Sequence, residues 1–79
     1  MPGRTDSGMS REAAEFVIYI INEVADRYGL YPSHVYRELN NSGCIQRYLV
    51  PFYDVLHTMS SESIAEDAIN YARLRGAAI

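Results

Sequence analysis

The chain has 79 residues, of which 48% are hydrophobic and seven are tyrosine, and its formal net charge is −3. This length accommodates one small domain, and the apolar content is too high for a disordered chain. No apolar run approaches the ~18 residues of a membrane span, and no signal-peptide pattern opens the sequence, so we expect a cytoplasmic protein. The single cysteine cannot form an internal disulfide.

The basic residues give little support for nucleic-acid binding. Seven arginines and no lysine oppose ten acidic residues, and no ten-residue window holds three of the arginines. Affinity for DNA or RNA comes mostly from clustered Lys and Arg that neutralise phosphates. We therefore do not expect the isolated chain to bind nucleic acid.

The domain organisation is simple. Residues 1–9 are rich in Gly, Pro and Ser, and we expect them to form a flexible tail. Residues 10–76 contain no repeat, low-complexity run or linker, so they should form a single helical domain. The patterns described next predict about four helices packed into a compact all-α bundle.

The first predicted helix covers residues 10–28. Ser10 suits its N-cap, and Gly29 suits a left-handed C-cap. Between these caps, apolar residues recur at spacings of three and four, which is typical of an amphipathic helix. The predicted inward residues are Ala13, Phe16, Val17, Ile20, Ile21, Val24 and Tyr28.

Two shorter helices should follow. One begins near Pro32, which suits a first helical position, and ends in the Asn-Asn-Ser-Gly stretch at 40–43. The next covers residues 44–49. Pro51 should kink or restart this helix, and residues 52–58 should be part helical and part extended. The predicted inward residues of both helices are Val35, Tyr36, Leu39, Ile45, Tyr48 and Leu49.

The last helix should be capped by Ser60 or Ser61 and should end before Gly76. The small residues in its apolar stripe should allow it to pack closely against the first helix. The stripe consists of Ile64, Ala65, Ala68, Ile69 and Ala72.

Asp54 and His57 are the strongest candidates for a catalytic pair. On a helix they lie one turn apart, and a carboxylate can orient an imidazole for base catalysis. The sequence lacks a Gly-x-Ser-x-Gly or comparable nucleophile turn, so we do not predict an enzyme. We expect His57 and Thr58 to hold a buried turn together by hydrogen bonds, with help from Asp54. A hydrolase or transferase built on Asp54 and His57 is the alternative.

The candidate metal ligands His34, Cys44 and His57 are ten and thirteen residues apart, with no C-x-x-C or H-x-x-x-H motif. A zinc site needs three or four ligands at workable spacing, so we predict no metal and no cofactor. A thiol at a helix start such as that of Cys44 can have a lowered pKa. A small buried hydrophobic role is the commoner outcome for a free cysteine.

Residues 32–50 have the outline of a helix-turn-helix, with two short helices joined by a glycine-containing turn. The second of these helices offers only Gln46 and Arg47 to base edges. A small DNA-binding regulator is therefore the alternative to the function favoured below.

The seven tyrosines are the feature of the sequence that most favours a role in partner binding. Tyrosine is favoured where one end of a ring is buried and the other is wet, as at protein interfaces. A core of this size cannot bury all seven, so we expect a partner-contact patch formed by Tyr28, Tyr31 and Tyr36. The alternative is that the tyrosines are simply large residues at the boundary of the core.

Four segments together resemble the small bacterial family known as domain of unknown function 3791. The most specific is the string Tyr-Asp-Val-Leu-His-Thr, and the others are generic amphipathic helix. The sequence departs from the family pattern in two ways. Pro51 interrupts the segment before this string, and the lysines expected in such proteins are absent. The segments are Glu15-Phe16-Val17-Ile18-Tyr19, Val35-Tyr36-x-x-Leu39, Tyr53-Asp54-Val55-Leu56-His57-Thr58 and Ile64-Ala65-Glu66-Asp67-Ala68.

The resemblance implies a short bacterial protein without an assigned activity. Members tend to be encoded near proteins that resemble ADP-ribosyltransferase toxins, which implies an antitoxin-like or accessory role. We therefore predict a non-catalytic protein–protein interaction module whose partner is another protein, such as a neighbouring toxin-like enzyme. Homodimerisation is a further expectation, because it would bury exposed tyrosines of a very small chain.

Overall fold

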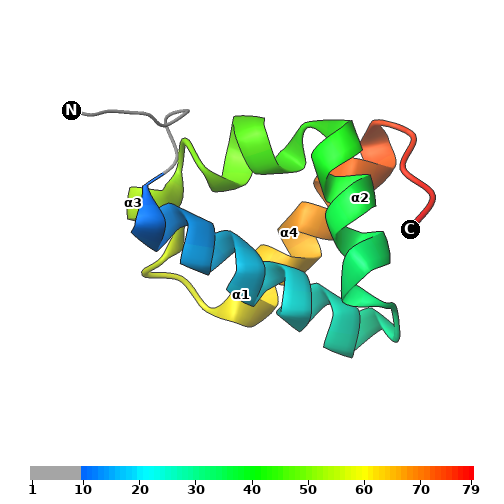
Figure 1. Ribbon diagram of the computed structural model, residues 1–79, viewed down its shortest axis with the longest axis horizontal. Helices are drawn as coiled ribbons and strands as arrows, with labels where there is room; N and C mark the ends of the chain where they lie inside the picture. Colours follow the sequence, from blue (N-terminus) through cyan, green and yellow to red (C-terminus); the bar gives the residue numbers. More distant parts are fainter. Residues whose placement is uncertain (1–9) are drawn as a thin grey trace.

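The computed structural model describes residues 10–79, which contain helices and turns and no strand (Figure 1). The predicted compact all-α bundle is confirmed, with the first and last helices as the longest pair. Residues 1–9, predicted to be a flexible tail, lie outside the described residues. The elements are α1 (Arg11–Tyr28), α2 (Pro32–Ser42), a π-helical turn η2 (Ile45–Leu49), α3 (Tyr53–Leu56) and α4 (Ser61–Leu74).

Helix α1 begins and ends at the predicted caps. The side-chain oxygen of Ser10 accepts a hydrogen bond from the Ala13 N–H at 3.1 Å. Gly29 adopts the left-handed region with φ +65°, and its N–H donates to the Ala25 carbonyl. The predicted inward face is buried except at Phe16, which is half-buried, and Tyr28, which is exposed. The inward prediction for Tyr28 is wrong because this residue ends the helix, where the core stops.

The third predicted helix, at 44–49, is a π-helical turn in which the Val50 N–H donates to the Ile45 carbonyl at 3.0 Å. Pro51 accounts for the widening, because in a regular α-helix its ring would clash with the carbonyl of Arg47. Of the predicted inward residues in α2 and η2, Tyr36 is the one that is exposed. That prediction is wrong because Tyr36 lies at the edge of the inward face of α2, where 52% of its surface stays exposed.

Residues 52–58 contain no extended segment, so that part of the prediction is wrong. Helix α3 forms a single turn, whose Leu56 N–H donates to the Phe52 carbonyl at 2.8 Å. The following turn is closed by the Thr58 N–H, which donates to the Val55 carbonyl at 3.2 Å. Local hydrogen bonds over three and four residues thus keep the segment coiled.

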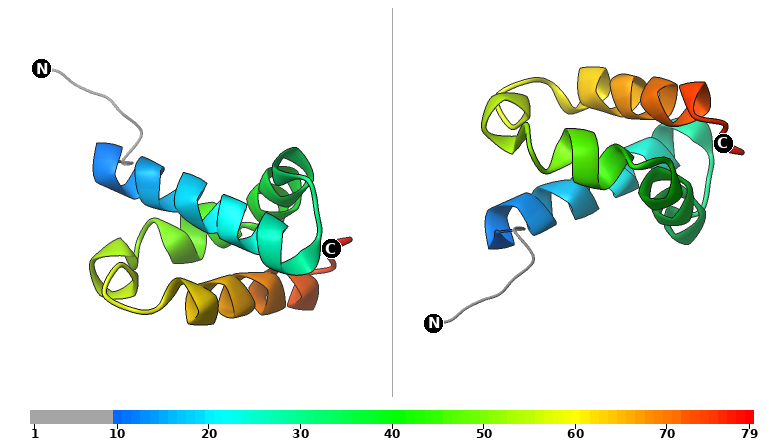
Figure 2. Two further views of the ribbon diagram at one scale, coloured as in Figure 1. Left: turned by 90° about the horizontal axis from the view of Figure 1, so that it is seen from below. Right: turned by 90° about the horizontal axis from the view of Figure 1, so that it is seen from above.

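Helix α4 is capped by Ser60, the first of the two candidates, whose hydroxyl accepts from the Ser63 N–H at 3.2 Å. All five residues of its predicted apolar stripe are buried, and α4 packs against both α1 and α2. Figure 2 shows the chain from η2 to α3 lying where α1 and α4 diverge toward the start of α1. Within the described residues, no helix is long and apolar enough to cross a membrane.

Candidate functional site

An apolar groove of about 250 Å³ opens between α1, α2 and η2. Its floor is made by buried side chains, among them Val17, Ile21 and Ile45. Its rims carry two large side chains that remain largely in water, Ile18 at 58% exposure and Tyr36 at 52%. The full lining is Ala14, Val17, Ile18, Ile21, Tyr36, Asn40, Ile45 and Gln46.

The local helical repeat explains how the chain builds this groove. Ala14, Ile18 and Ile21 are spaced by four and three residues along α1, so they share one side of the helix. Tyr36 and Asn40 are spaced by four along α2 and form the facing wall. The groove can therefore bind apolar side chains, while the Asn40 amide offers hydrogen bonds at its edge.

Sequence reasoning missed Ile18, although a signal was present. Residues 16–21 are six consecutive hydrophobic residues, Phe-Val-Ile-Tyr-Ile-Ile, within a helix. A surface helix buries only one stripe, so part of such a run must face outward. In the structure, Ile18 and Tyr19 are the exposed members.

The predicted tyrosine patch is divided. Tyr28, Tyr31 and Tyr36 are all exposed, Tyr31 most of all at 81%. Tyr36 lines the apolar groove, whereas Tyr28 lies beside α4, where the guanidinium carbon of Arg73 is 5.8 Å from its ring centroid. Tyr31 is the N-cap residue of α2 and lines neither cavity. The structure therefore does not place Tyr28 and Tyr36 in one pocket, and their role in partner contact stays a prediction.

The cavity beside Tyr28 is polar and lies where the end of α1 meets the start of α4. Arg27 pairs there with Glu23 at 2.6 Å and with Glu62 at 3.5 Å. The hydrogen bond to Glu23 is the main cause that raises the pKa of Arg27. The one cation of this cavity, Arg27, is thus already paired with carboxylates of the same chain.

Three of the remaining tyrosines have packing roles. Tyr48 stacks on Tyr71 with ring centroids 5.7 Å apart, and the guanidinium carbon of Arg75 lies 3.6 Å from the Tyr71 ring. The Tyr48 hydroxyl donates to Asp67 at 3.4 Å, and burial, assisted by the Asp67 charge, raises the pKa of Tyr48. Tyr53 packs edge-on against Phe16 at 5.4 Å. These rings join η2 and α3 to α1 and α4, as expected for large residues at the boundary of a core.

The residues Asp54, His57 and Thr58 of the family string are exposed, so the predicted buried turn is wrong in that respect. The Thr58 hydroxyl donates to the Val55 carbonyl at 2.8 Å and does close the turn. His57 instead stacks on Tyr53 with ring centroids 4.8 Å apart. No hydrogen bond joins Asp54 to His57 in the described part of the chain, and Leu56 is the member of the string that enters the core.

Cys44 is fully buried, and its thiol donates weakly to the Ala68 carbonyl at 3.9 Å. Burial raises the pKa of this thiol to about 12, against a smaller opposite effect of the Arg75 charge. The prediction that the helix start lowers the pKa of Cys44 is therefore wrong. Residues 10–79 contain no group of three His, Cys, Asp or Glu side chains that could hold a metal ion.

The helix-turn-helix outline is present in part. Helix α2 and η2 are joined through Gly43, but the second element is a π-helical turn of five residues. Gln46 lines the apolar groove, and the aliphatic part of Arg47 lies over Gly43. DNA binding by this unit stays an alternative that the structure does not test.

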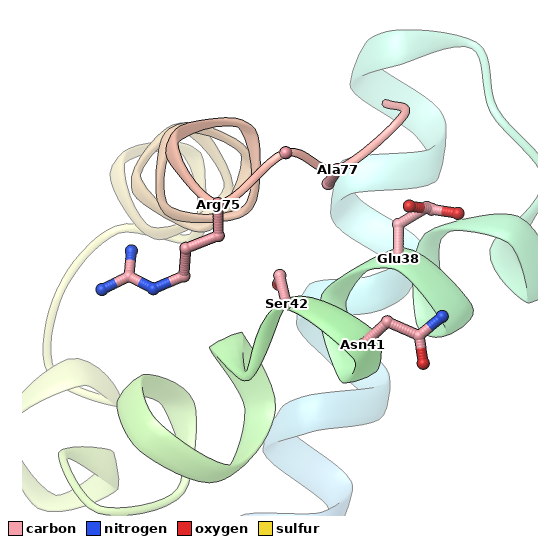
Figure 3. Close-up of a pocket in the computed structure, with 6 residues that line it drawn as sticks. Glu38, Asn41, Ser42, Arg75 and Ala77 are labelled. Atoms are coloured by element: carbon pink, nitrogen blue, oxygen red, sulfur yellow. The ribbon is translucent and has the colours of Figure 1, made fainter.

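A third, smaller cavity of about 100 Å³ lies where the segment after α4 meets the end of α2 (Figure 3). The chain is held there by Glu38, which accepts from the Ala78 N–H at 3.1 Å. Nε2 of His34 lies 3.0 Å from the Ala78 carbonyl oxygen, and the Arg73 Nε donates to the Ile79 carbonyl at 2.9 Å. These contacts hold Ala78 against α2 and Ile79 against α4, so this cavity lies between segments that are packed as part of the fold.

Taken together, the fold and its open groove define a small all-helical domain with an apolar candidate site. Its sequence matches the family described as Protein of unknown function (DUF3791) over residues 15–74, and the chain belongs to this family. The resemblance carried by the string at 53–58 is thus confirmed. No curated protein and no solved structure matches the chain.

Proposed function

We propose that this protein is a protein–protein interaction module that binds an apolar segment of a partner in the groove between α1, α2 and η2. The observation that carries the proposal is the exposure of Ile18 and Tyr36 on either side of a buried apolar floor. Apolar surface left in water beside a concave floor is typical of a site that a partner covers.

The groove suits the apolar face of a partner helix. Such a helix presents anchors at spacings of three and four residues, and these could enter between the two rims. Tyrosine is enriched among the residues that dominate binding energy, so Tyr36 is the expected anchor on this side. The amides of Asn40 and Gln46 supply polar contacts at the edge of the groove.

The first partner to test is an ADP-ribosyltransferase-like effector, which the module would neutralise or assist. This choice is supported by what the family resemblance implies about neighbouring genes. The net charge of −3 also favours a basic partner surface, such as a positively charged nucleotide cleft. The proposed role is binding rather than catalysis, and Asp54 and His57 take no part in it.

Affinity capture from native cytosol, with the full chain as bait at ~0.15 M salt, tests the proposal. We expect one stoichiometric protein to be retained by the wild type and lost with Tyr36→Ser. Tyr31→Ser is the matched control, because it makes the same change at an exposed tyrosine outside the groove. Circular dichroism should show the same helicity for all three baits.

Retention of the captured protein by Tyr36→Ser would contradict the groove as its site. An empty eluate from a folded bait would contradict the proposed function. An electrophoretic shift of DNA that persists at ~0.15 M salt would then favour the regulator, because binding by charge alone weakens steeply with salt.

A further inference from the structure

The side of α1 that faces away from the core carries two adjacent large apolar residues. Ile18 and Tyr19 are 58% and 55% exposed, and Tyr19 does not line the groove. At 3.6 residues per turn, these two side chains lie at the middle of a surface that is otherwise polar. We call this surface the outer face of α1; it consists of Arg11, Glu15, Ile18, Tyr19, Asn22 and Asp26, all exposed.

No element in residues 10–79 lies over this face. Helix α1 packs against α4, α2 and η2, and Figure 2 shows its other side uncovered by the described chain. A single exposed apolar residue is ordinary on a protein surface. Two adjacent ones at the centre of a helix face form a small apolar patch that is available to a partner.

The charges of the outer face are arranged with opposite signs at its two ends. Arg11 lies near the start of the helix and Asp26 near its end, and each is seven residues from the nearer member of the Ile18–Tyr19 pair. With a rise of ~1.5 Å per residue, both charges lie about 11 Å along the axis from the midpoint of that pair. The face is therefore complementary to itself when it is turned by 180°.

We infer that the outer face of α1 pairs with the same face of a second copy of this chain, with the two helices antiparallel. A two-fold axis between Ile18 and Tyr19 places Arg11 of each copy opposite Asp26 of the other. The same register places Glu15 opposite Asn22, so no like charges meet. In a parallel pair each charged residue would face its own equivalent, and like charges would repel.

The two ion pairs set the orientation more than the affinity. Exposed pairs contribute little to stability, and Arg11 already lies 3.3 Å from Glu15 within its own chain. Most of the binding should come from the four apolar side chains at the centre, which become buried together. An interface of ordinary size takes ~800 Å² from each partner, so neighbouring residues of α1 must also contribute.

This inference does not depend on the proposed function. Tyr36 belongs to the groove and lies on α2, whereas Tyr19 belongs to the outer face and does not line the groove. Ile18 stands at the border of both surfaces, so it is not used to tell them apart. Failure of the capture experiment and failure of self-association can therefore be observed separately.

Sedimentation equilibrium of the full chain, at concentrations up to roughly 1 mM, measures the self-association. We expect a reversible dimer whose dissociation constant rises at least ~10-fold with Tyr19→Lys, a change of about 1.4 kcal/mol. Tyr31→Lys is the matched control and should dimerise like the wild type. Both tyrosines are exposed, so neither change should alter helicity by circular dichroism.

A charge exchange tests the antiparallel register. In Arg11→Asp and in Asp26→Arg, each homodimer would contain two like-charge pairs, so both variants should dimerise more weakly than the wild type. An equal mixture of the two variants should restore the affinity, because the mixed dimer contains two opposite-charge pairs. In parallel packing the wild type already contains two like-charge pairs, so the single variants would be no weaker than the wild type and their mixture would associate more tightly than the wild type.

The inference is overturned if the wild type stays monomeric throughout the concentration range. It is equally overturned if a dimer persists with Tyr19→Lys, or is abolished by Tyr36→Ser while Tyr19→Lys has no effect. In that last case the second copy occupies the groove. Absence of rescue in the variant mixture would exclude the antiparallel register.

Discussion

The surface of helix α1 differs between the side that meets α4 and the side that meets α2. At the solvent edge of its contact with α4, the surface is polar, and Arg27 is shared between Glu23 and Glu62. Toward α2, the surface is apolar, and Ile18 and Tyr36 face water across an open floor. On one side of the helix the arginine is thus paired within the chain, while the other side holds apolar surface that nothing in the described chain covers.

The difference shows how a very small domain can separate folding from binding. Paired charges at a seam leave few unsatisfied groups for another molecule to use. Apolar side chains at the rim of a groove contribute little to the fold, so they are free to contribute to a partner.

The largest effect should come from comparing two neighbouring isoleucines of α1. Ile20 is fully buried, so Ile20→Ala should lower the free energy of unfolding by about 2–5 kcal/mol. Ile18→Ala, at the exposed rim, should change it by less than about 0.5 kcal/mol. Urea denaturation monitored by circular dichroism measures both. Equal losses would mean that the rim is packed as part of the core.

Cys44 should make stability depend on alkaline pH. Its pKa is about 12 in the folded chain and 9.0 ordinarily, so the folded state keeps the proton that the unfolded state loses. Its contribution is fully present below pH 9.0 and is lost as the pH rises toward 12. The slope should approach about 1.4 kcal/mol per pH unit.

The measurement is the difference in unfolding free energy between the wild type and Cys44→Ala at several alkaline pH values. The variant removes the thiol, so the contributions of the tyrosines cancel in the difference. The advantage of the wild type should shrink as the pH rises above 9.0. A difference that is constant with pH would show that the thiol titrates normally.

The cap of α4 should have a smaller effect. Ser60→Ala removes the acceptor for the Ser63 N–H and should lower the free energy of unfolding by about 1 kcal/mol. Ser61→Ala is the matched control, because Ser61 lies inside the helix and caps nothing. Chemical denaturation of the pair decides between the two serines. A larger loss with Ser61→Ala would reverse the assignment of the cap.

The smallest effect should be found at the polar edge of the contact between α1 and α4. Glu62→Gln removes one of the two partners of Arg27 but leaves the 2.6 Å pair with Glu23. Exposed ion pairs are screened by salt, so the thermal midpoint should stay close to that of the wild type at ~0.15 M salt. Differential scanning calorimetry at low and high salt checks this. A large loss that is independent of salt would show that this edge contributes to the fold.

The parts of the fold that depend on neighbouring residues could be predicted from the sequence. The caps at Ser10, Gly29 and Ser60 and the apolar stripes of α1 and α4 follow from short-range spacing. The π-helical form of η2 could not be predicted, because it depends on how the chain accommodates Pro51 while η2 packs against α1 and α2. The same holds for the positions of Tyr28 and Tyr36, which lie at the edges of helix faces.

The candidate site itself was less accessible to sequence reasoning. Periodicity identifies which residues of one helix lie together, but the groove depends on the distance between α1 and α2. Of its two rim residues, Tyr36 was predicted as a contact and Ile18 was not. The six-residue apolar run in α1 indicated excess outward surface, without indicating which member would be exposed.

The buried position of Cys44 has a consequence for measuring the motions of this protein. It is the only cysteine of the chain, and its thiol lies at the start of η2 against the Ala68 carbonyl of α4. A reagent that alkylates thiols can reach it only when η2 separates from α4. The rate of alkylation under native conditions therefore reports how often this junction opens, and a partner that holds the domain closed should slow the reaction.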